Sequence, residues 1–289
     1  MLRHTKKQHI IPRYHIRNFS IKEDKAYWAH VYNVRTRQYF GYVPSEDHFK
    51  KHNVYEIKDE NGEFIERNRI ENCLCEQETI DSELIKVIIS RVQRCRKKAF
   101  RPLFLSEQEV IALSGILALQ VFRFPEILNE LENNTKKHIE KRSYLSKFPT
   151  HTARKLVLEG CLAPRKPSNK PGLVSPLAGI LQLFLMFYSC SIGYTKDGNI
   201  ITGDCPYYFP NGDKGLKGTD SKIGVIVFPL TSNTVLCFHS LKYCKKYHRR
   251  LVLLNDKDVL EINRRIAKRS KLICSQRQLS DEELERILS

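Results

Sequence analysis

The chain has 289 residues, with 49 Lys or Arg against 32 Asp or Glu, which gives a formal net charge of +17 when histidines are neutral. Apolar residues make up 41% and charged residues 28%, a balance that excludes a disordered tail and a low-complexity protein. A chain of this length buries enough surface to fold without a disulfide or a structural metal.

The opening part of the chain reads as a β-rich unit. Residues 1–20 interleave apolar and basic side chains, so we expect an ordered element there. Aromatic and β-branched residues predict strands over 26–34, 38–43 and 53–57, the first two separated by a turn at 35–37.

The middle of the chain reads as helical. From Asp81, apolar residues recur every four positions, which is the spacing of one helix face. Ser106 and Glu109 predict a capping box at the start of a second helix, and Pro125 ends or kinks that helix. Further helices are expected over about 126–142 and 152–158, before a loop over 163–172.

Beyond this loop the pattern returns to strands. The apolar run from Leu173 to Cys190 is interrupted by Pro176 and Gly179. A bilayer needs roughly 20 apolar residues, so we interpret the run as a buried helix. Asp197-Gly198 predicts a hairpin between its flanking strands. Other strands are expected over 224–230, 234–239, 251–255 and 271–275, with helices over 256–268 and after a capping box at Ser280.

This order predicts an α+β protein: a β-rich N-terminal unit and a β-rich C-terminal part around a helical middle, with one composite core. We expect a single domain over residues 1–289, with possible sub-units at 1–80, 81–160 and 173–289. The N-terminus shows no signal peptide, and nine scattered cysteines fit reduced thiols, so a cytoplasmic location is expected.

The positive charge favours nucleic acid as a partner, because a basic surface concentrates polyanions and releases their counterions. A solvated basic surface, or an acidic protein or membrane surface, are the alternatives. We expect no membrane span, and we leave a protein partner and the oligomeric state open. Eight basic side chains are expected to hold a nucleic-acid backbone: Arg13, Arg17, Lys97, Lys98, Lys245, Lys246, Arg249 and Arg250.

Four polar residues are candidates for chemistry. His9 stands in a string of His, Arg and Tyr and can exchange protons near neutral pH, or be a structural histidine. Gln120 and Arg123 share one face of an apolar helix, where they either bind a ligand or close a hydrogen-bond network. Asp204 follows a strand, as a catalytic acid or an ordinary turn residue.

Other patterns are weaker. Cys73 and Cys75 lack the spacing of a zinc site. The carboxylates ahead of the first long helix are either its solvated face or include one residue that joins a site: Glu66, Glu71, Glu76 and Glu78.

Several runs occur in an order that resembles the prokaryotic domain of unknown function 4238 family: KKQHIIPRYHIRNF, ALQVFRFP, IITGDCPY and IVFPLTSNTVLCF. The resemblance places the family's recurrent polar residues on His9, Gln120, Arg123 and Asp204. This chain has Gly203 and Thr231 where the family pattern has serine. Association with bacterial accessory genes implies a role in phage defence or as a toxin.

The leading hypothesis is a nuclease-like, nucleic-acid-processing enzyme. His9 would be the general base or acid, Asp204 would orient it or hold a divalent cation, and Gln120 with Arg123 would position a phosphate. The alternatives are a non-catalytic nucleic-acid-binding module and a structural or interaction component of a defence system. The sequence leaves the metal and any other cofactor open.

Overall fold

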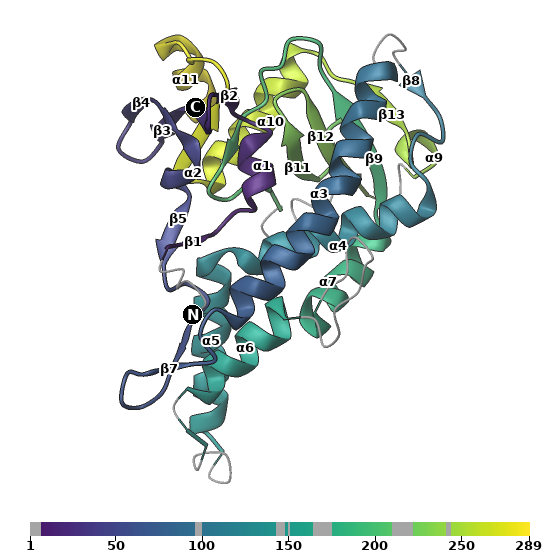
Figure 1. Cartoon of the computed structure of the whole chain (residues 1–289). Coiled ribbons are helices and arrows are strands. Elements are labelled where there is room, and N and C mark those ends of the chain that lie inside the picture. The colour runs from purple at the N-terminus through teal and green to yellow at the C-terminus, as the bar shows by residue number, and fades with distance from the viewer. Residues whose placement is uncertain are drawn as a thin grey trace.

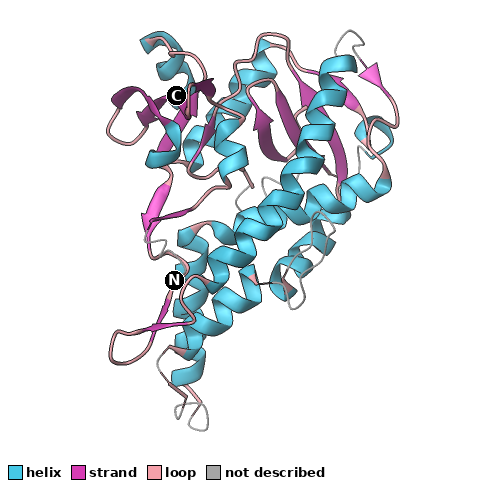
Figure 2. Ribbon diagram, in the orientation of Figure 1, coloured by secondary structure: helices cyan, strands magenta, loops and turns pink. Residues whose placement is uncertain are grey.

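The computed structural model describes residues 7–95, 100–142, 148–149, 151–163, 175–209, 222–240 and 244–289. Helices and strands are mixed along the chain, which confirms the α+β class (Figures 1 and 2). Strands β3 (Ala26–Asn33) and β4 (Gln38–Pro44) lie beside the C-terminal helix α11 (Asp281–Leu288) in Figure 1, so segments far apart in the sequence share one region.

The first part of the chain forms short elements: β1 (Lys7–His9), α1 (Arg13–Arg17), β2 (Ile21–Glu23), β3 (Ala26–Asn33), β4 (Gln38–Pro44), α2 (Ser45–His48), β5 (Lys50–His52), β6 (Ile57–Lys58) and β7 (Phe64–Ile65). The single strand expected over 53–57 is wrong, because residues 53–55 form a turn between β5 and β6. Asn53 starts this turn with a φ of 52°, a left-handed conformation that asparagine tolerates.

The helices of the middle part are α3 (Arg69–Cys95), α4 (Glu107–Arg123), α5 (Pro125–Glu140) and α6 (Thr152–Leu162). Helix α3 begins well before Asp81, so the expected boundary at residue 80 falls inside a helix. The buried face of its first turns includes polar Gln77 and Asp81, which interrupt the apolar repeat and conceal the helix from a periodicity argument.

The predicted helix starts are confirmed at Ser106 and Ser280. Each serine hydroxyl accepts a hydrogen bond from the backbone N–H three residues later, and the Glu at that position accepts one from the serine N–H. Pro125 is the first residue of α5, as its fixed φ and missing N–H favour.

Two larger sheets organise the strands. The remaining elements are α7 (Pro176–Met186), β8 (Phe100–Arg101), β9 (Ser189–Tyr194), β10 (Thr202–Gly203), β11 (Ile226–Thr231), β12 (Thr234–His239), α9 (Cys244–Tyr247), β13 (Leu251–Leu253), α10 (Asp256–Arg269) and β14 (Leu272–Ser275). One sheet has the order β10-β14-β3-β2, with β4 also paired to β3, and the other has the order β11-β12-β9-β13-β8. C-terminal strands therefore complete the N-terminal sheet.

The hairpin expected at Asp197-Gly198 is wrong, because β9 and β10 belong to different sheets. Gly198 does take the left-handed φ of 66° that the dipeptide favours. Strand β9 pairs instead with β12 and, in parallel, with β13, whereas β10 pairs with β14. The Asp-Gly dipeptide therefore predicts the local turn conformation, whereas the partners of β9 and β10 are set by tertiary strand pairing.

The second sheet is buried on both faces. Along β11 and β12, Ile226, Phe228 and Leu236 face a core shared with α3 and α4, whereas Val227 and Val235 face a core shared with the first sheet and α10. This alternation is the period-2 geometry of a strand, and it explains why both strands read as continuous apolar runs.

Helix α7 corrects the expectation of a buried apolar helix. Ala178 and Leu185 are buried, but Ile180 is 65% exposed and Leu183 61% exposed. Composition alone could not distinguish a helix with one packed face from a helix packed all round. Among the described residues, no single helix is long and apolar enough to cross a membrane, and α4 with α5 passes that test only as a pair bent by 70°.

The close approach of β10 to the end of α10 explains one departure from the family pattern. A Cβ at position 203 would overlap Ser270 Oγ and would lie 2.7 Å from the Leu272 carbonyl oxygen. Because the Leu272 oxygen belongs to the backbone, it cannot rotate away. Glycine is therefore required here, and the serine of the family pattern does not fit.

We expect Gly203→Ala to lower the free energy of unfolding by about 1–3 kcal/mol, the usual cost of overpacking a buried site. Gly160→Ala in α6 is the control, because its Cβ would meet only the side chain of Leu177, which is 38% exposed and can move. Thermal melting of both variants tests this, and an unchanged Gly203→Ala variant would contradict it.

Candidate functional site around His9 and Glu46

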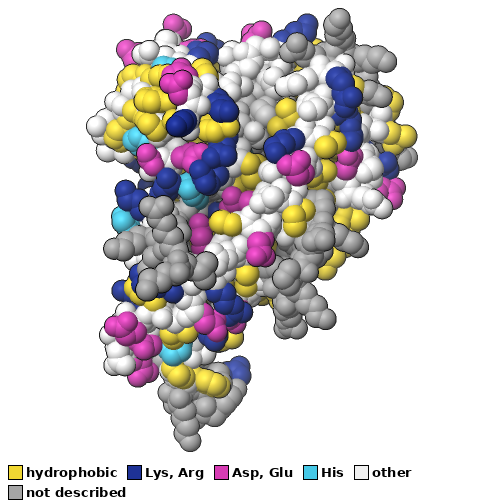
Figure 3. Space-filling model, viewed as in Figure 1, with side chains coloured by type: hydrophobic (Ala, Val, Ile, Leu, Met, Phe, Trp, Pro, Cys, Tyr) yellow, Lys and Arg dark blue, Asp and Glu magenta, His cyan; other side chains and the backbone are white. Residues whose placement is uncertain are grey.

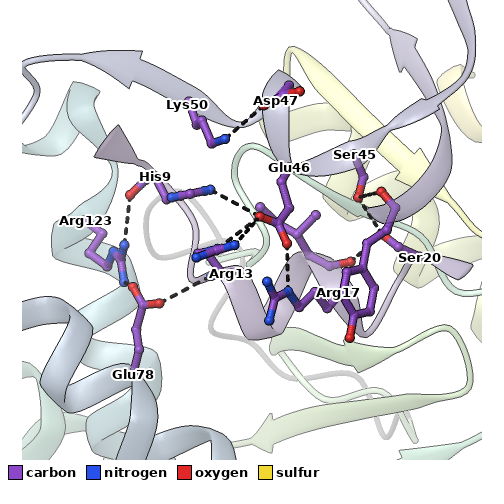
Figure 4. Close-up of polar contacts among 12 residues, drawn as sticks. His9, Arg13, Arg17, Ser20, Ser45, Glu46, Asp47, Lys50, Glu78 and Arg123 are labelled. Atoms are coloured by element: carbon purple, nitrogen blue, oxygen red, sulfur yellow. Dashed lines mark hydrogen bonds and ion pairs between the residues drawn. The ribbon is translucent and has the colours of Figure 1, made fainter. Parts of the chain in front are cut away.

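Three short elements bring His9 and its neighbours together. Strand β1 pairs with β5, so His9 lies opposite Lys50. Pro12 then starts α1, whose four-residue spacing puts Arg13 and Arg17 on one face. Helix α2 supplies Glu46 from the other side, and Figure 4 shows the side chains of His9, Arg13 and Arg17 around its carboxylate, with Lys50 directed to Asp47.

Glu46 is the centre of an ion-pair cluster. Its Oε2 lies 2.9 Å from Arg13 Nη2, and its Oε1 accepts a 2.7 Å hydrogen bond from Arg17 Nε. Burial opposes ionisation of Glu46, but the bonds from Arg17 and Arg13 outweigh it and lower the pKa of this carboxyl. Arg13 is 53% and Arg17 37% exposed, so solvent and anions can reach both guanidinium groups.

His9 borders this cluster as a neutral imidazole. Its Nε2 lies 4.0 Å from Glu46 Oε2 and has no hydrogen-bond partner among the described residues. Burial, followed by the charges of Lys50 and Arg13, lowers the pKa of His9 to about 4. At pH 7 the ring is therefore neutral, and its Nε2 is buried.

Arg123 contacts the backbone of His9 from the buried side of the site. Its side chain is 1% exposed, forms an ion pair with Glu78 of α3, and donates from Nη2 to the His9 carbonyl oxygen at 2.8 Å. Tyr55 donates from its hydroxyl to the same oxygen at 3.3 Å and to the Arg123 carbonyl oxygen at 3.2 Å. Burial alone would lower the pKa of Arg123, but Glu78 and Tyr55 raise it well above its usual value.

Glu78 also fixes α1. Its second oxygen accepts a 3.3 Å hydrogen bond from the backbone N–H of Arg13, at the start of that helix. Glu71, one of the other carboxylates of α3, is buried with an unpartnered oxygen. Burial raises the pKa of Glu71 to about 7, against the lowering effect of Arg123.

Gln120 lies on the same side as Arg123. Its Nε2 is 3.5 Å from the carbonyl oxygen of Ile10, and its Oε1 is buried without a partner among the described residues. The structure therefore gathers three of the four residues expected from the sequence around the backbone of residues 9 and 10. Arg123 and Gln120 are 1% and 2% exposed, so neither side chain faces solvent.

Asp204 lies elsewhere. It follows β10, and its Oδ1 accepts hydrogen bonds from the backbone N–H groups of Lys271 at 2.8 Å and Leu272 at 3.3 Å. Burial raises the pKa of this carboxyl, although the two backbone bonds oppose that shift. No hydrogen bond or ion pair within the described part of the chain joins Asp204 to His9, Gln120 or Arg123.

The residues expected to hold nucleic acid are dispersed. Arg13 and Arg17 belong to the Glu46 cluster. Arg249 donates from Nε to the Leu105 carbonyl oxygen at 2.6 Å and pairs with Glu107, and Arg250 is only partly exposed. Lys246 lies over the ring of Tyr247, with 5.2 Å to its centre. Lys97, Lys98 and the side chain of Lys245 lie outside the described residues.

Basic groups do not form one uninterrupted patch on the face in Figure 3, where acidic side chains lie close to several of them. Within the described ranges, no group of three or more His, Cys, Asp or Glu side chains could hold a metal ion.

Sequence reasoning missed Glu46, Lys50 and Tyr55. Glu46 belongs to α2, a single helical turn directly after β4, and only the packing of α2 against α1 gives it a role. Glu78 was considered only within a group of helix carboxylates. The spacing of Glu71 and Glu78 places both carboxylates on one face of α3. Together with Arg123, an arginine on an apolar helix, this spacing was the signal in the sequence for a buried ion pair.

The cluster offers a defined set of chemical capacities. A neutral imidazole can take a proton, and paired guanidinium groups with half-exposed N–H donors can hold a phosphate or carboxylate. Lys50 adds a third cation, paired with Asp47 at 2.9 Å.

A family model described as "Protein of unknown function (DUF4238)" matches residues 7–161, which is more than half of the chain. This match covers β1, α1, α2 and α4, and so includes every residue of the His9 and Glu46 cluster. Neither the curated proteins nor the solved structures contain a match.

We expect Arg123→Met to lower the free energy of unfolding by about 3–5 kcal/mol, because it leaves the Glu78 carboxylate without its buried partner. The double variant Arg123→Met/Glu78→Gln removes both charges and should lose less than the sum of the single losses. Urea unfolding of the wild type, the single variants Arg123→Met and Glu78→Gln, and the double variant measures this coupling. Additive losses would show that the pair does not act as a unit.

His9 should titrate near pH 4 when its ring resonances are followed by NMR. Removing a nearby cation with Arg13→Met should raise this midpoint, and Glu46→Gln should lower it, because Glu46 favours the protonated ring. The unfolded histidine binds its proton near pH 6.5, so stability from neutral His9 is full above that pH and is lost as pH falls towards 4. A midpoint near 6.5 in the folded wild type would refute this assignment.

Proposed function

The chain belongs to the DUF4238 family, whose description names no function. From the geometry of the His9 and Glu46 cluster we propose that it is a nucleic-acid-processing enzyme that cleaves phosphodiester bonds. One observation carries the proposal. A neutral histidine, whose buried Nε2 has no hydrogen-bond partner among the described residues, lies beside two solvent-reachable arginines whose planar donors suit phosphate.

In this proposal His9 is the general base. It takes a proton on Nε2 from the attacking hydroxyl or water; this atom has no hydrogen-bond partner among the described residues but is buried, so the substrate must displace side chains that cover it. The attacking oxygen bonds to phosphorus as the bond to the leaving oxygen breaks, and the leaving oxygen takes its proton from water. Burial and nearby cations keep the ring unprotonated at neutral pH, so no proton must be lost before the reaction begins.

Arg13 and Arg17 hold the phosphate and stabilise the charge that develops on its oxygens. Glu46 holds both guanidinium groups in place before the substrate binds. Arg13 is the more exposed of the two and can turn from Glu46 towards a phosphate without leaving the carboxylate unpaired, since Arg17 remains bonded to Glu46.

The other sequence candidates take supporting roles. Arg123 and Gln120 are positioning residues, because they contact the backbone of residues 9 and 10 and are almost fully buried. Asp204 stabilises the junction of β10 with β14 through two backbone hydrogen bonds. A role in phage defence or as a toxin stays a proposal that rests on this activity.

Binding without cleavage is the second candidate. The guanidinium of Arg17 lies over the ring of Tyr27, with 4.7 Å to its centre. A cation beside an aromatic face is a platform on which a single-stranded base can stack. In this case bound oligonucleotide would stay intact over hours.

We expect the wild type to cleave labelled RNA or DNA, and His9→Ala to lower the rate by about 10²–10⁴-fold, the usual loss when a general base is removed. Arg13→Met should weaken both binding and cleavage. Asp204→Ala should lower the melting temperature while residual folded protein keeps its rate.

Lys22→Met is the matched control, since Lys22 is an exposed lysine of β2 outside the cluster. No cleavage of either substrate by the wild type, or equal cleavage by wild type and His9→Ala, would rule out the proposed enzyme.

A further inference from the structure

A second cationic site lies away from His9, where the β3–β4 turn meets α10 and α11. A cavity of about 420 Å³ opens there, and its rim carries Arg35, Arg37, Arg264 and Lys268. None of these residues takes part in the Glu46 cluster. The cavity therefore stands as a separate feature, whatever His9 does.

Below its cationic rim this cavity has apolar as well as polar lining. Val34, Ala267 and Ile287 line it and are buried. A volume of this size is within the range of small-ligand pockets, which are mostly apolar with a few polar groups that fix orientation. The combination suits a ligand with one anionic end and one flat, weakly polar end.

Contacts within the protein fix part of the rim and leave the rest available. Arg264 donates from Nε to the Arg286 carbonyl oxygen at 2.7 Å and from Nη2 to Ser289 Oγ at 3.1 Å. Arg35 donates from Nη2 to the Lys268 carbonyl oxygen at 3.1 Å. The ammonium of Lys268 is exposed and forms no ion pair with a described residue.

Arg37 has an unusual backbone for an arginine. Its φ is 58°, a left-handed conformation that glycine or asparagine adopts at lower cost. Its side chain pairs with Glu285, but both partners are about 60% exposed, so the pair adds little stability. The turn thus carries an arginine where local structure favours a smaller residue.

We propose that this cavity binds a nucleotide, free or as one unit of a strand, with its phosphate on the four cations and its base and sugar against the apolar wall. Arginine forks match phosphate oxygens in pairs, and Lys268 supplies an unpaired charge. Inorganic phosphate alone should bind more weakly, since it would not use the apolar wall.

The test is calorimetric titration of the full chain with three probes: ADP, a short single-stranded oligonucleotide, and inorganic phosphate. The variant Arg37→Asn/Lys268→Gln removes two rim charges while asparagine keeps the left-handed turn. Lys257→Gln is the control, because Lys257 lies on the same helix α10 but not in the cavity wall.

We expect ADP or the oligonucleotide to bind the wild type and the control equally, and the double variant at least about 10-fold more weakly. ADP binding identifies a free nucleotide, whereas binding of the oligonucleotide alone identifies a strand. Equal binding by double variant and wild type, or no binding of either probe to the wild type, would overturn the proposal. The oligonucleotide titrations use the His9→Ala background for every protein, so the outcome is independent of cleavage at His9, and Arg37→Asn/Lys268→Gln leaves Arg13 and Arg17 unchanged.

Discussion

A guanidinium that is 1% exposed needs a carboxylate next to it, and Glu78 supplies one for Arg123. The cost of burying either charge alone would be several kcal/mol, so the pair forces α3 and α4 into one arrangement. The remaining donors of Arg123 then determine what else lies nearby. One of them binds the His9 carbonyl oxygen, and Glu78 binds the first N–H of α1. A single buried ion pair therefore fixes both ends of the segment that carries His9 and Arg13.

This arrangement separates two tasks that the sequence assigned to one set of residues. Arg123, Gln120 and Tyr55 act on the backbone of the segment, from the buried side. Arg13 and Arg17 are partly exposed, and the mostly buried side chains of His9 and Glu46 lie beside them (Figure 4). Rigid support behind a partly exposed set of side chains is what a functional site requires, because misplacement by an ångström is costly.

Local rules predicted the local features well. Capping boxes at Ser106 and Ser280 need only residues three apart, so the sequence contains the whole interaction. The His9 site is different, because its members come from β1, α1, α2, α3 and α4. The sequence identified His9, Arg13, Arg17 and Arg123 by residue type and by family order, but Glu46 becomes significant only when α2 packs beside α1. Asp204 was expected in the site because its residue type suits catalysis. Its carboxylate instead accepts hydrogen bonds from two backbone N–H groups, which the pairing of β10 with β14 brings close to it.

Net charge is similarly uninformative without geometry. A formal +17 suggests a continuous basic surface, yet Arg91 is paired with Glu109, Arg154 with Glu132, and Arg249 with Glu107. Such pairs contribute little to long-range attraction, since their fields cancel within a few ångströms. Binding of an anion then depends on cations that are exposed or can exchange partners. Arg13 meets this condition beside His9, and Lys268 meets it at the cavity of α10. In both places a phosphate would gain a guanidinium or ammonium partner without leaving a buried carboxylate unpaired.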